Sequence, residues 1–346
     1  MTALEKLEKS LETNIVFLGE SITEAEYGTE AYKDSWAYRV ECRFRERYGG
    51  KLNFFNCGVS GTGSGLGIFR LSRDVLPKNP DIVFIEYAIN DLDEIDRDKG
   101  KILIDMEGIV RKLKTANPDI AVVFLYSGSR QYRNCSFLHQ IIAEYYGIPA
   151  VDLQEYVKSF LSDGKHSWEE FYADNVHPNA KGHGLYARCI LDSLEKESVK
   201  FLGTAIKEKE PLMNYRFDNP RMTGWQQGRF TGNWKVCELN QPGKIESIIY
   251  SDTVGDSFEF DFGGRCLGLY YQVSTDGGRL ECRIDGEREY KIEMYDSYEW
   301  VSLSRFQVID LGEGPHHAVF TVSRDKHPES TGNTIRVGYF LLDGVR

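Results

Sequence analysis

The sequence predicts a two-domain protein: an α/β domain built on a parallel sheet, followed by an all-β sandwich. Three observations lead to this prediction. The chain has 346 residues, which is more than one hydrophobic core usually serves. Over the first 200 residues, short apolar runs alternate with helical patterns, as in a parallel sheet covered by helices on both faces. Beyond residue 213 the helical period is lost and short alternating runs follow, which favours antiparallel strands.

Five short runs, most of them solidly apolar, are predicted to form the strands of the first domain. They are residues 15–18, 52–55, 82–85, 120–126 and 149–151. Helical spacing fills the intervals between them, and we expect helices at about 35–48, 66–71, 99–114, 137–146, 157–161 and 180–197. The first strand stops abruptly at Gly19, and Gly49-Gly50 ends the first of these helices.

The domain boundary is predicted from a change in pattern near residue 201. The segment Lys207 to Pro211 is charged and broken by proline, which suits a linker. We therefore expect an α/β domain at 1–200, a linker at 201–212 and a jelly-roll-like sandwich at 213–346. Runs with strand character in the second domain are 257–262, 279–284, 301–309, 318–322 and 334–342.

Composition and charge exclude several classes of partner. The net charge is −11, so neither a nucleic acid nor an anionic membrane is an expected partner. No run approaches the ~18 apolar residues of a membrane span, and the charged N-terminus does not resemble a signal peptide. Seven cysteines are odd in number, scattered and without a CxxC pair, which is typical of reduced thiols. We expect a cytoplasmic protein.

Polar residues and glycines follow the predicted strands where catalytic loops would gather. Ser21 comes directly after the first strand, Gly61 after the second and Asn90 after the third, while Asp174 and His177 precede the final helix. Ser21 alone could be a helix cap. Together these residues supply a nucleophile (Ser21), a base (His177), a group that orients the base (Asp174) and oxyanion donors from Ser21, Gly61 and Asn90.

Four short blocks carry a resemblance to the SGNH (GDSL-type) hydrolase family: Gly19–Thr23, Asn56–Gly61, Ala88–Asp91 and Asp174–Pro178. The resemblance covers roughly residues 12–197 and implies a flavodoxin-like sheet with the catalytic roles given above. Two positions depart from the family pattern. Glu20 stands where the family more often has aspartate, and Ala88 stands where it usually has glycine. Gly58 is an alternative to Gly61 as the second oxyanion donor.

Other chemistry-bearing residues are interpreted as structural. We expect His183 to have a structural role on the final helix and His139 to lie on a helix face. Asp91 is expected to cap a turn or helix. Cys57 lies near the site but lacks a base of its own. The loop 58–65 is rich in glycine, but no Lys-Ser/Thr follows it, so it is not a P-loop. Three further histidines are expected at the surface of the second domain: His316, His317 and His327.

The predicted loops around the site are polar and aromatic, which suits a sugar better than a lipid. They are residues 24–32, 127–132 and 165–169. Candidate substrate contacts are Glu20, Trp36, Tyr132 and Trp168.

The second domain resembles a galactose-binding-type sandwich, the fold of many carbohydrate-binding modules. Its cues are Phe258 to Gly264 and Arg283 to Gly286. Candidate sugar platforms are Trp225, Trp234, Tyr270, Tyr271 and Trp300, although each one alone is interpreted as a core residue. The resemblance requires no cofactor, and it leaves open a structural calcium ion and a homodimer.

The combination of these two domains is similar to intracellular bacterial esterases. It implies removal of O-acetyl groups from plant oligosaccharides, mannan or xylan fragments above all, through an acetyl-Ser21 intermediate. The alternatives are a lipid or acyl-thioester hydrolase with the same triad, and a sugar-binding protein with an inactive catalytic domain.

Overall fold

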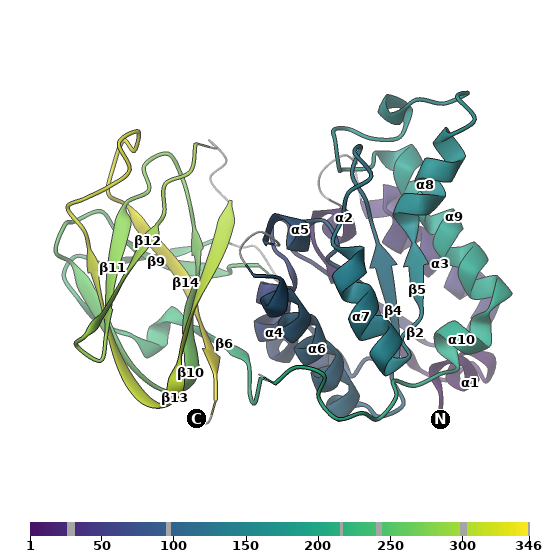
Figure 1. Cartoon of the computed structure of the whole chain (residues 1–346), viewed down its shortest axis with the longest axis horizontal. Helices are drawn as coiled ribbons and strands as arrows, with labels where there is room; N and C mark the ends of the chain where they lie inside the picture. The colour runs from purple at the N-terminus through teal and green to yellow at the C-terminus, as the bar shows by residue number, and fades with distance from the viewer. Residues whose placement is uncertain (26–31, 95–97, 215–216, 240–243, 298–302, 345–346) are drawn as a thin grey trace. The chain divides into compact units, whose positions relative to one another are not determined.

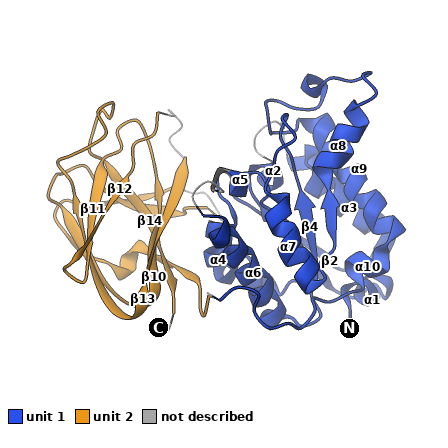
Figure 2. Cartoon of the chain, in the orientation of Figure 1, with its two compact units in different colours: residues 1–216 blue, residues 217–346 orange. Residues whose placement is uncertain are grey.

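The chain forms two compact units, residues 1–216 and 217–346 (Figure 2). The computed structural model describes residues 1–25, 32–94, 98–214, 217–239, 244–297 and 303–344. Among these residues, no helix is both long enough and apolar enough to cross a membrane. The predicted division into an α/β domain and an antiparallel β domain is confirmed.

The first unit contains a five-stranded parallel sheet in the order β2-β1-β3-β4-β5, which is the flavodoxin-like order that the resemblance implies. The strands are β1 (Thr13–Gly19), β2 (Leu52–Gly58), β3 (Ile82–Glu86), β4 (Ala121–Tyr126) and β5 (Ala150–Asp152). Every residue of β3 and β4 is buried. The solid apolar runs in the sequence are therefore explained by helices on both faces of the sheet.

One face of the sheet forms a large apolar core with residues of α1 (Ala3–Glu8), α3 (Trp36–Tyr48), α8 (Leu153–Leu161), α9 (Ala180–Lys196) and α10 (Ser198–Leu202). A second group packs side by side, α4 against α6 and α6 against α7 (Figure 1). Its members are α4 (Ser64–Arg70), α6 (Lys99–Ala116) and α7 (Ser136–Tyr146). Two short helices, α2 (Ser21–Glu24) and α5 (Asn90–Glu94), directly follow β1 and β3.

The segment predicted as a linker, 201–212, packs on the first unit instead. Phe201 and Leu202 belong to its apolar core. Further along, the Glu107 carboxylate, on α6, accepts hydrogen bonds from the backbone N–H groups of Leu212 (2.6 Å) and Met213 (2.9 Å). This segment, with its proline and charges, is thus part of the first unit. The boundary between the two units lies between residues 216 and 217.

The second unit is a nine-stranded antiparallel sheet with an apolar core of its own. Its strands are β6 (Arg221–Gly224), β7 (Arg229–Thr231), β8 (Lys235–Glu238), β9 (Ser247–Ser251), β10 (Ser257–Gln272), β11 (Arg279–Ile284), β12 (Arg288–Glu293), β13 (Ser304–Val322) and β14 (Ile335–Asp343).

Two long strands, β10 and β13, run through both layers of the sandwich. β10 pairs with β7 over residues 257–259 and with β14 over residues 266–271, with a register shift between Gly264 and Cys266. Gly264 has φ +141°, and a Cβ there would lie 1.8 Å from the Asp343 carbonyl oxygen, so only glycine fits this bend. The layers meet where the Phe260 and Phe340 rings stack at 4.4 Å.

Two of the predicted strands are in fact parts of one. The runs 301–309 and 318–322 both belong to β13, apart from residues 301–302, which lie outside the described residues, and Leu303, which precedes the strand. The Gly-Glu-Gly-Pro sequence at 312–315 has the composition of a turn. In the structure the strand bends there and continues, opposite the bend of β10.

Candidate active site

Ser21, Gly61 and Asn90 lie at one edge of the parallel sheet because their strands end in register. Gly19, the last residue of β1, pairs with Gly58 on one side and Glu86 on the other. The loops that leave these three strands therefore start side by side, and α2 and α5 lie at this end of the sheet (Figure 1). This edge is where open α/β sheets gather their ligands.

A continuous chain of hydrogen bonds joins Ser21, His177 and Asp174. The Ser21 Oγ lies 2.9 Å from the His177 Nε2, and the His177 Nδ1 lies 2.8 Å from the Asp174 Oδ2. Because Nδ1–H donates to the carboxylate, Nε2 is left to accept the serine proton. The imidazole side chain is 21% exposed, so a substrate can reach it from solvent. The predicted proximity of residues 21 and 177 is present in the structure.

Asp174 is kept ionised by the loop that it starts. Partial burial opposes ionisation. However, the backbone N–H groups of His177 and Val176 donate to Oδ1 at 2.7 and 2.8 Å, and the imidazole contacts Oδ2, so the pKa of Asp174 is lowered. An ionised carboxylate next to Nδ1–H holds the tautomer that makes Nε2 a base.

The loop that carries Asp174 and His177 is fixed from several sides. Trp168 donates its Nε1–H to the Asp174 carbonyl oxygen (2.6 Å), and the Arg130 backbone N–H donates to the Asn175 carbonyl oxygen (2.7 Å). Just after the loop, the Asn179 side chain caps α9 through the Lys181 N–H (2.9 Å). A rigidly held base loses little freedom when it reacts.

The predicted oxyanion donors Gly61 and Asn90 come shortly after β2 and β3. Gly61 has φ +71°, a left-handed conformation that favours glycine. The Asn90 Nδ2 donates to the Thr62 carbonyl oxygen at 3.2 Å, which fixes the amide and leaves its second N–H available. The alternative donor, the Gly58 N–H, already donates to the Asn56 Oδ1 at 2.8 Å. This geometry favours Gly61, and the donor roles themselves stay predictions.

Glu20 does not face the substrate, which corrects our prediction. Its side chain is fully buried and accepts hydrogen bonds from the backbone N–H groups of Ile89 (3.2 Å) and Asn90 (2.8 Å). Burial and the neighbouring Glu86 carboxyl raise the pKa of Glu20 well above its ordinary value. Glu20 therefore joins the first loop to the third beneath the candidate oxyanion hole.

Glu86 was missed by the sequence analysis. It ends the apolar run of β3, is fully buried, and accepts a hydrogen bond from the Thr23 hydroxyl at 3.0 Å and another from Ser127. Burial raises the pKa of Glu86. A charged residue closing a buried strand was the signal that could have found it, because such a side chain needs polar partners.

The three predicted aromatic contacts have different positions. Trp36 is fully buried and packs edge-on against Phe17 at 5.1 Å, so it is a core residue and the prediction is corrected. Trp168 is 8% exposed and stacks on Tyr172 at 3.6 Å, so it supports the Asp174 loop and offers substrate little surface. Tyr132 is 38% exposed and has φ +53°, and it stays a candidate contact.

His183, His139 and Asp91 are structural, as expected. The His183 Nδ1 accepts from the Trp36 N–H at 3.2 Å, and burial lowers the pKa of His183 to about 3. The His139 Nε2 lies 2.8 Å from the Asp91 Oδ2, while the Asp91 Oδ1 accepts the Ser64 N–H at 2.7 Å. Asp91 therefore caps α4 and is paired with a buried imidazole.

The surroundings of Cys57 and of the histidines in the second unit show whether each side chain is buried and paired. Burial raises the pKa of Cys57 to about 11, so its thiol is a poor nucleophile near neutral pH. His316, expected at the surface, is an exception among the three histidines of the second unit. Its side chain is 8% exposed, with Nδ1 at 2.8 Å from the Asp285 Oδ2 and Nε2 at 2.7 Å from the Gly312 carbonyl oxygen.

The predicted sugar platforms of the second unit are mostly covered. Tyr270 and Tyr271 are 1% and 5% exposed. Trp225 and Trp234 pack against the core and are only partly exposed. Trp300 lies outside the described residues, as do 26–31 of the predicted loop 24–32. No group of three or more His, Cys, Asp or Glu side chains that could bind a metal is found in the described part of the chain.

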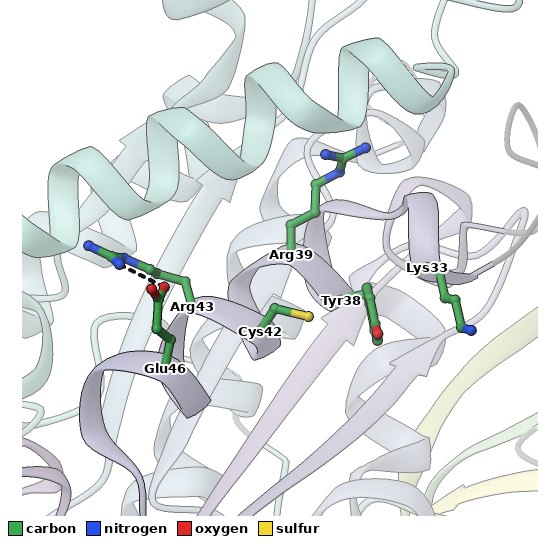
Figure 3. A pocket seen from close by; sticks show the side chains of 6 residues that line it. All are labelled: Lys33, Tyr38, Arg39, Cys42, Arg43 and Glu46. Carbon is green, nitrogen blue, oxygen red and sulfur yellow. Dashed lines mark hydrogen bonds and ion pairs between the residues drawn. The ribbon is translucent and has the colours of Figure 1, made fainter.

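A pocket of about 610 Å³ is found beside α3, and it is a separate feature (Figure 3). Three of its six lining residues are cationic, and one of these, Arg43, is paired with Glu46 at 2.8 Å. The lining residues are Lys33, Tyr38, Arg39, Cys42, Arg43 and Glu46. None of them belongs to the triad, and they include no serine or histidine, so the pocket is not a second site of the same chemistry.

Comparison with known proteins gives a family match and similar solved structures. Residues 17–185 match the GDSL-like Lipase/Acylhydrolase family. A search of curated proteins gives no match. Among solved structures, a two-domain esterase (CEX) active on acetylated mannans is similar over 99% of this chain and 94% of its own, with a TM-score of 0.85 and 21% identity. The same enzyme co-crystallised with mannopentaose gives a TM-score of 0.84, 21% identity and the same coverage.

At this identity the structural likeness establishes the fold of both units, while the family match bears on the first. The matched segment contains Ser21, Gly61 and Asn90, and Asp174 and His177 lie near its end. The first unit of the chain is a hydrolase domain of the GDSL (SGNH) family, a family of ester hydrolases, and a β-sandwich follows it.

Proposed function

We propose that the protein is a serine esterase that removes O-acetyl groups from oligosaccharides, with mannan or xylan fragments as the favoured substrates. One observation carries the esterase part of the proposal: the continuous hydrogen-bond chain from the Ser21 Oγ through His177 to the Asp174 carboxylate. A nucleophile, a base and an orienting acid in this order can convert a neutral hydroxyl into an attacking group.

In the first half of the reaction, the Ser21 Oγ attacks the acetyl carbonyl carbon while the His177 Nε2 takes the hydroxyl proton. The carbonyl oxygen becomes negative, and donors from the Ser21 N–H, the Gly61 N–H and the Asn90 Nδ2 stabilise it. His177 then gives its proton to the sugar oxygen, the ester C–O bond breaks, and the deacetylated sugar leaves. The acetyl group remains on Ser21.

In the second half, His177 takes a proton from a water molecule that attacks the acetyl-Ser21 carbonyl carbon. The same donors hold the second oxyanion, the proton returns to the Ser21 Oγ, and acetate leaves. Throughout both halves Asp174 stays ionised and stabilises the imidazolium, because its pKa is lowered by the loop.

The surface beside the triad supports a sugar substrate. The loop 127–133 is joined to the Asp174 loop through the Arg130 N–H. It carries the exposed Tyr132 ring, and the Arg130 side chain forms an ion pair with Glu169 at 2.5 Å. Tyr132 is the one exposed large hydrophobic side chain in the described loops 127–134 and 162–179. An aromatic face among charged groups suits a sugar ring better than an acyl tail.

The relatives support the same substrate class. The two-domain esterase with the same succession of units is active on acetylated mannans, and it was crystallised with mannopentaose. A GDSL-type lipid or acyl-thioester hydrolase would use the same triad and is the alternative.

Acetate release from acetylated mannan, xylan and pectin oligosaccharides tests the proposal. Ser21→Ala should abolish release, because Ser21 supplies the attacking oxygen. Ser162→Ala is the matched control, since Ser162 is an exposed serine bonded to the backbone of α8. Acetate release by Ser21→Ala equal to that of the unmodified protein would end the proposal.

Acyl-chain profiling separates the proposed substrate from the alternative. On 4-nitrophenyl esters, we expect kcat/KM to be highest for acetate and to fall steeply by octanoate. A maximum at octanoate, or hydrolysis of acyl-CoA faster than of acetylated oligosaccharides, would replace the sugar substrate by a lipid or thioester while leaving the triad chemistry in place.

A further inference from the structure

Arg70 is a buried cation that the proposed reaction does not use directly. It is the last residue of α4, and its side chain is 1% exposed. An arginine is always charged in a protein, and a buried charge is tolerated only when it is paired and hydrogen-bonded. The position of its partners therefore indicates what it does.

One nitrogen of Arg70 contacts the backbone at the ends of β1 and β2 and the side chain of the residue that follows β3. Its Nη2 lies 3.1 Å from the Gly19 carbonyl oxygen, 2.6 Å from the Cys57 carbonyl oxygen and 3.1 Å from the Tyr87 hydroxyl oxygen. Gly19 ends β1, Cys57 lies at the end of β2, and Tyr87 directly follows β3.

These three contacts stand a few residues before the donors themselves. Gly19 precedes Ser21 by two residues, Cys57 precedes Gly61 by four, and Tyr87 precedes Asn90 by three. The guanidinium thus links the ends of β1 and β2 to the side chain of Tyr87, the first residue after β3.

The surrounding sequence holds Arg70 in this position. Its Nη1 pairs with the Asp74 Oδ2 at 3.1 Å, across a π-helical turn at Leu71–Val75, a local widening of the helix that often marks functional sites. Gly67, one turn earlier, lets Tyr87 come close: a Cβ there would lie 2.7 Å from the Tyr87 hydroxyl oxygen. Both features serve the same contact between α4 and the strand ends.

We propose that Arg70 is a positioning residue for the oxyanion hole, holding the Ser21 N–H, the Gly61 N–H and the Asn90 amide at the spacing that one oxyanion needs. This inference rests on the proposed serine esterase mechanism. Donors displaced by about 1 Å can cost about 100-fold in rate. Because they act on charge that develops only in the transition state, their displacement lowers kcat and leaves KM nearly unchanged.

Arg70→Lys tests the inference, since lysine keeps the charge but lacks the planar fork. On 4-nitrophenyl acetate we expect kcat to fall by roughly 10- to 100-fold with KM changed less than about threefold. The inhibition constant of phenylboronic acid, whose adduct on serine places an oxygen in the oxyanion hole, should rise by a similar factor. A purely structural role would lower the melting temperature without changing the ratio of this inhibition constant to KM.

A double-mutant cycle with Asn90→Ala gives a second readout. Asn90→Ala alone should cost about 10²–10³ in kcat. If Arg70 acts through the donors, Arg70→Lys should lower kcat by a smaller factor in the Asn90→Ala variant than in the unmodified protein, because one of the three donors that it holds is then absent. Arg73→Lys is the matched control, because Arg73 binds the same Asp74 at 2.5 Å but its side chain is 23% exposed instead of buried, and its kcat should stay within about twofold.

Two results would overturn the inference: a kcat within about threefold of the unmodified protein for Arg70→Lys, or losses for Arg70→Lys and Asn90→Ala that multiply in full. If Arg70→Lys does not fold, Tyr87→Phe, which removes one of the three contacts, enters the same cycle under the same criteria. If the unmodified protein and Ser21→Ala are equally inactive on every ester, the proposed function has failed instead.

Discussion

Two carboxylate–imidazole pairs of the same length lie in the first unit, and only one of them is placed for catalysis. Asp174 and His177 are 2.8 Å apart, as are Asp91 and His139. The first pair is partly exposed, and its second imidazole nitrogen faces the Ser21 hydroxyl. The second pair is buried, and its aspartate caps α4.

The difference lies in what the pair faces rather than in the pair itself. An imidazole becomes a general base when its free nitrogen meets a proton that a substrate needs removed. A buried pair of the same geometry contributes hydrogen bonds to the fold instead. Substitutions in the two pairs should therefore separate turnover from stability.

The largest effect is expected for His177→Ala. Turnover of 4-nitrophenyl acetate should fall by roughly 10⁶-fold, because the proton of Ser21 then has no acceptor. His166→Ala is the matched control, since His166 is an exposed histidine paired with Glu170. Turnover within about tenfold of the unmodified protein for His177→Ala would remove His177 from the mechanism.

A smaller loss is expected for Asp174→Asn, which keeps the shape of the side chain but removes its charge. The amide can hold the wrong imidazole tautomer, so kcat should fall by roughly 10⁴-fold. Steady-state kinetics on the same ester give this number. A loss as large as that for His177→Ala would mean that Asp174 does more than orient the base.

The buried pair should respond in the opposite way. His139→Ala leaves the Asp91 carboxylate buried without its imidazole, and we expect about 3–5 kcal/mol less stability in urea unfolding. The kcat of the fraction that remains folded should stay within about tenfold of the unmodified protein. A loss of turnover like that of His177→Ala, with stability unchanged, would show that the Asp91–His139 pair takes part in catalysis. The two pairs would then not differ in role.

Two carboxyl groups near Ser21 should respond to pH with opposite sign. The folded-state pKa of Asp174 is lowered, so its stabilising contribution is present above its unfolded-state pKa and is lost as the pH falls. The folded-state pKa of Glu20 is raised by burial and by Glu86. Its contribution is therefore fully present below its unfolded-state pKa and is lost as the pH rises through the folded-state value.

Glu20→Gln tests the predicted pH dependence of the Glu20 contribution, because glutamine resembles the protonated carboxyl group. We expect its urea-unfolding free energy to decline less with rising pH than that of the unmodified protein. Asp174→Asn should instead remove part of the decline at acidic pH. An unchanged pH dependence for Glu20→Gln would show that Glu20 ionises in the folded protein without cost.

The fold could be predicted because its strands are marked strongly in the sequence. Runs such as Ile82 to Ile85 are buried on both faces and contain no competing pattern. The predicted break between residues 309 and 318 was wrong, because a glycine- and proline-containing segment can also bend a strand that continues. The predicted linker was wrong because charge and proline do not reveal backbone hydrogen bonds such as those to Glu107.

The site could be predicted only as far as the ends of the strands. Because β1, β2 and β3 end in register, Ser21, Gly61 and Asn90 come to one edge of the sheet whichever way their side chains point. The direction of a side chain is a different matter: Glu20 precedes Ser21 and Trp36 begins α3, yet both point into the interior. Arg70 and Glu86 were missed because the partners that explain them come from distant parts of the sequence.

Covalent labelling with diethyl 4-nitrophenyl phosphate tests the central claim most directly, because the reagent reacts much faster with a serine that a neighbouring base activates than with an ordinary serine. The account predicts one diethylphosphoryl group per chain, found by mass spectrometry on the peptide that contains Ser21. Esterase activity should be lost in proportion to the label. Activity that survives full labelling of Ser21, or a label that inactivates from another residue, would contradict it.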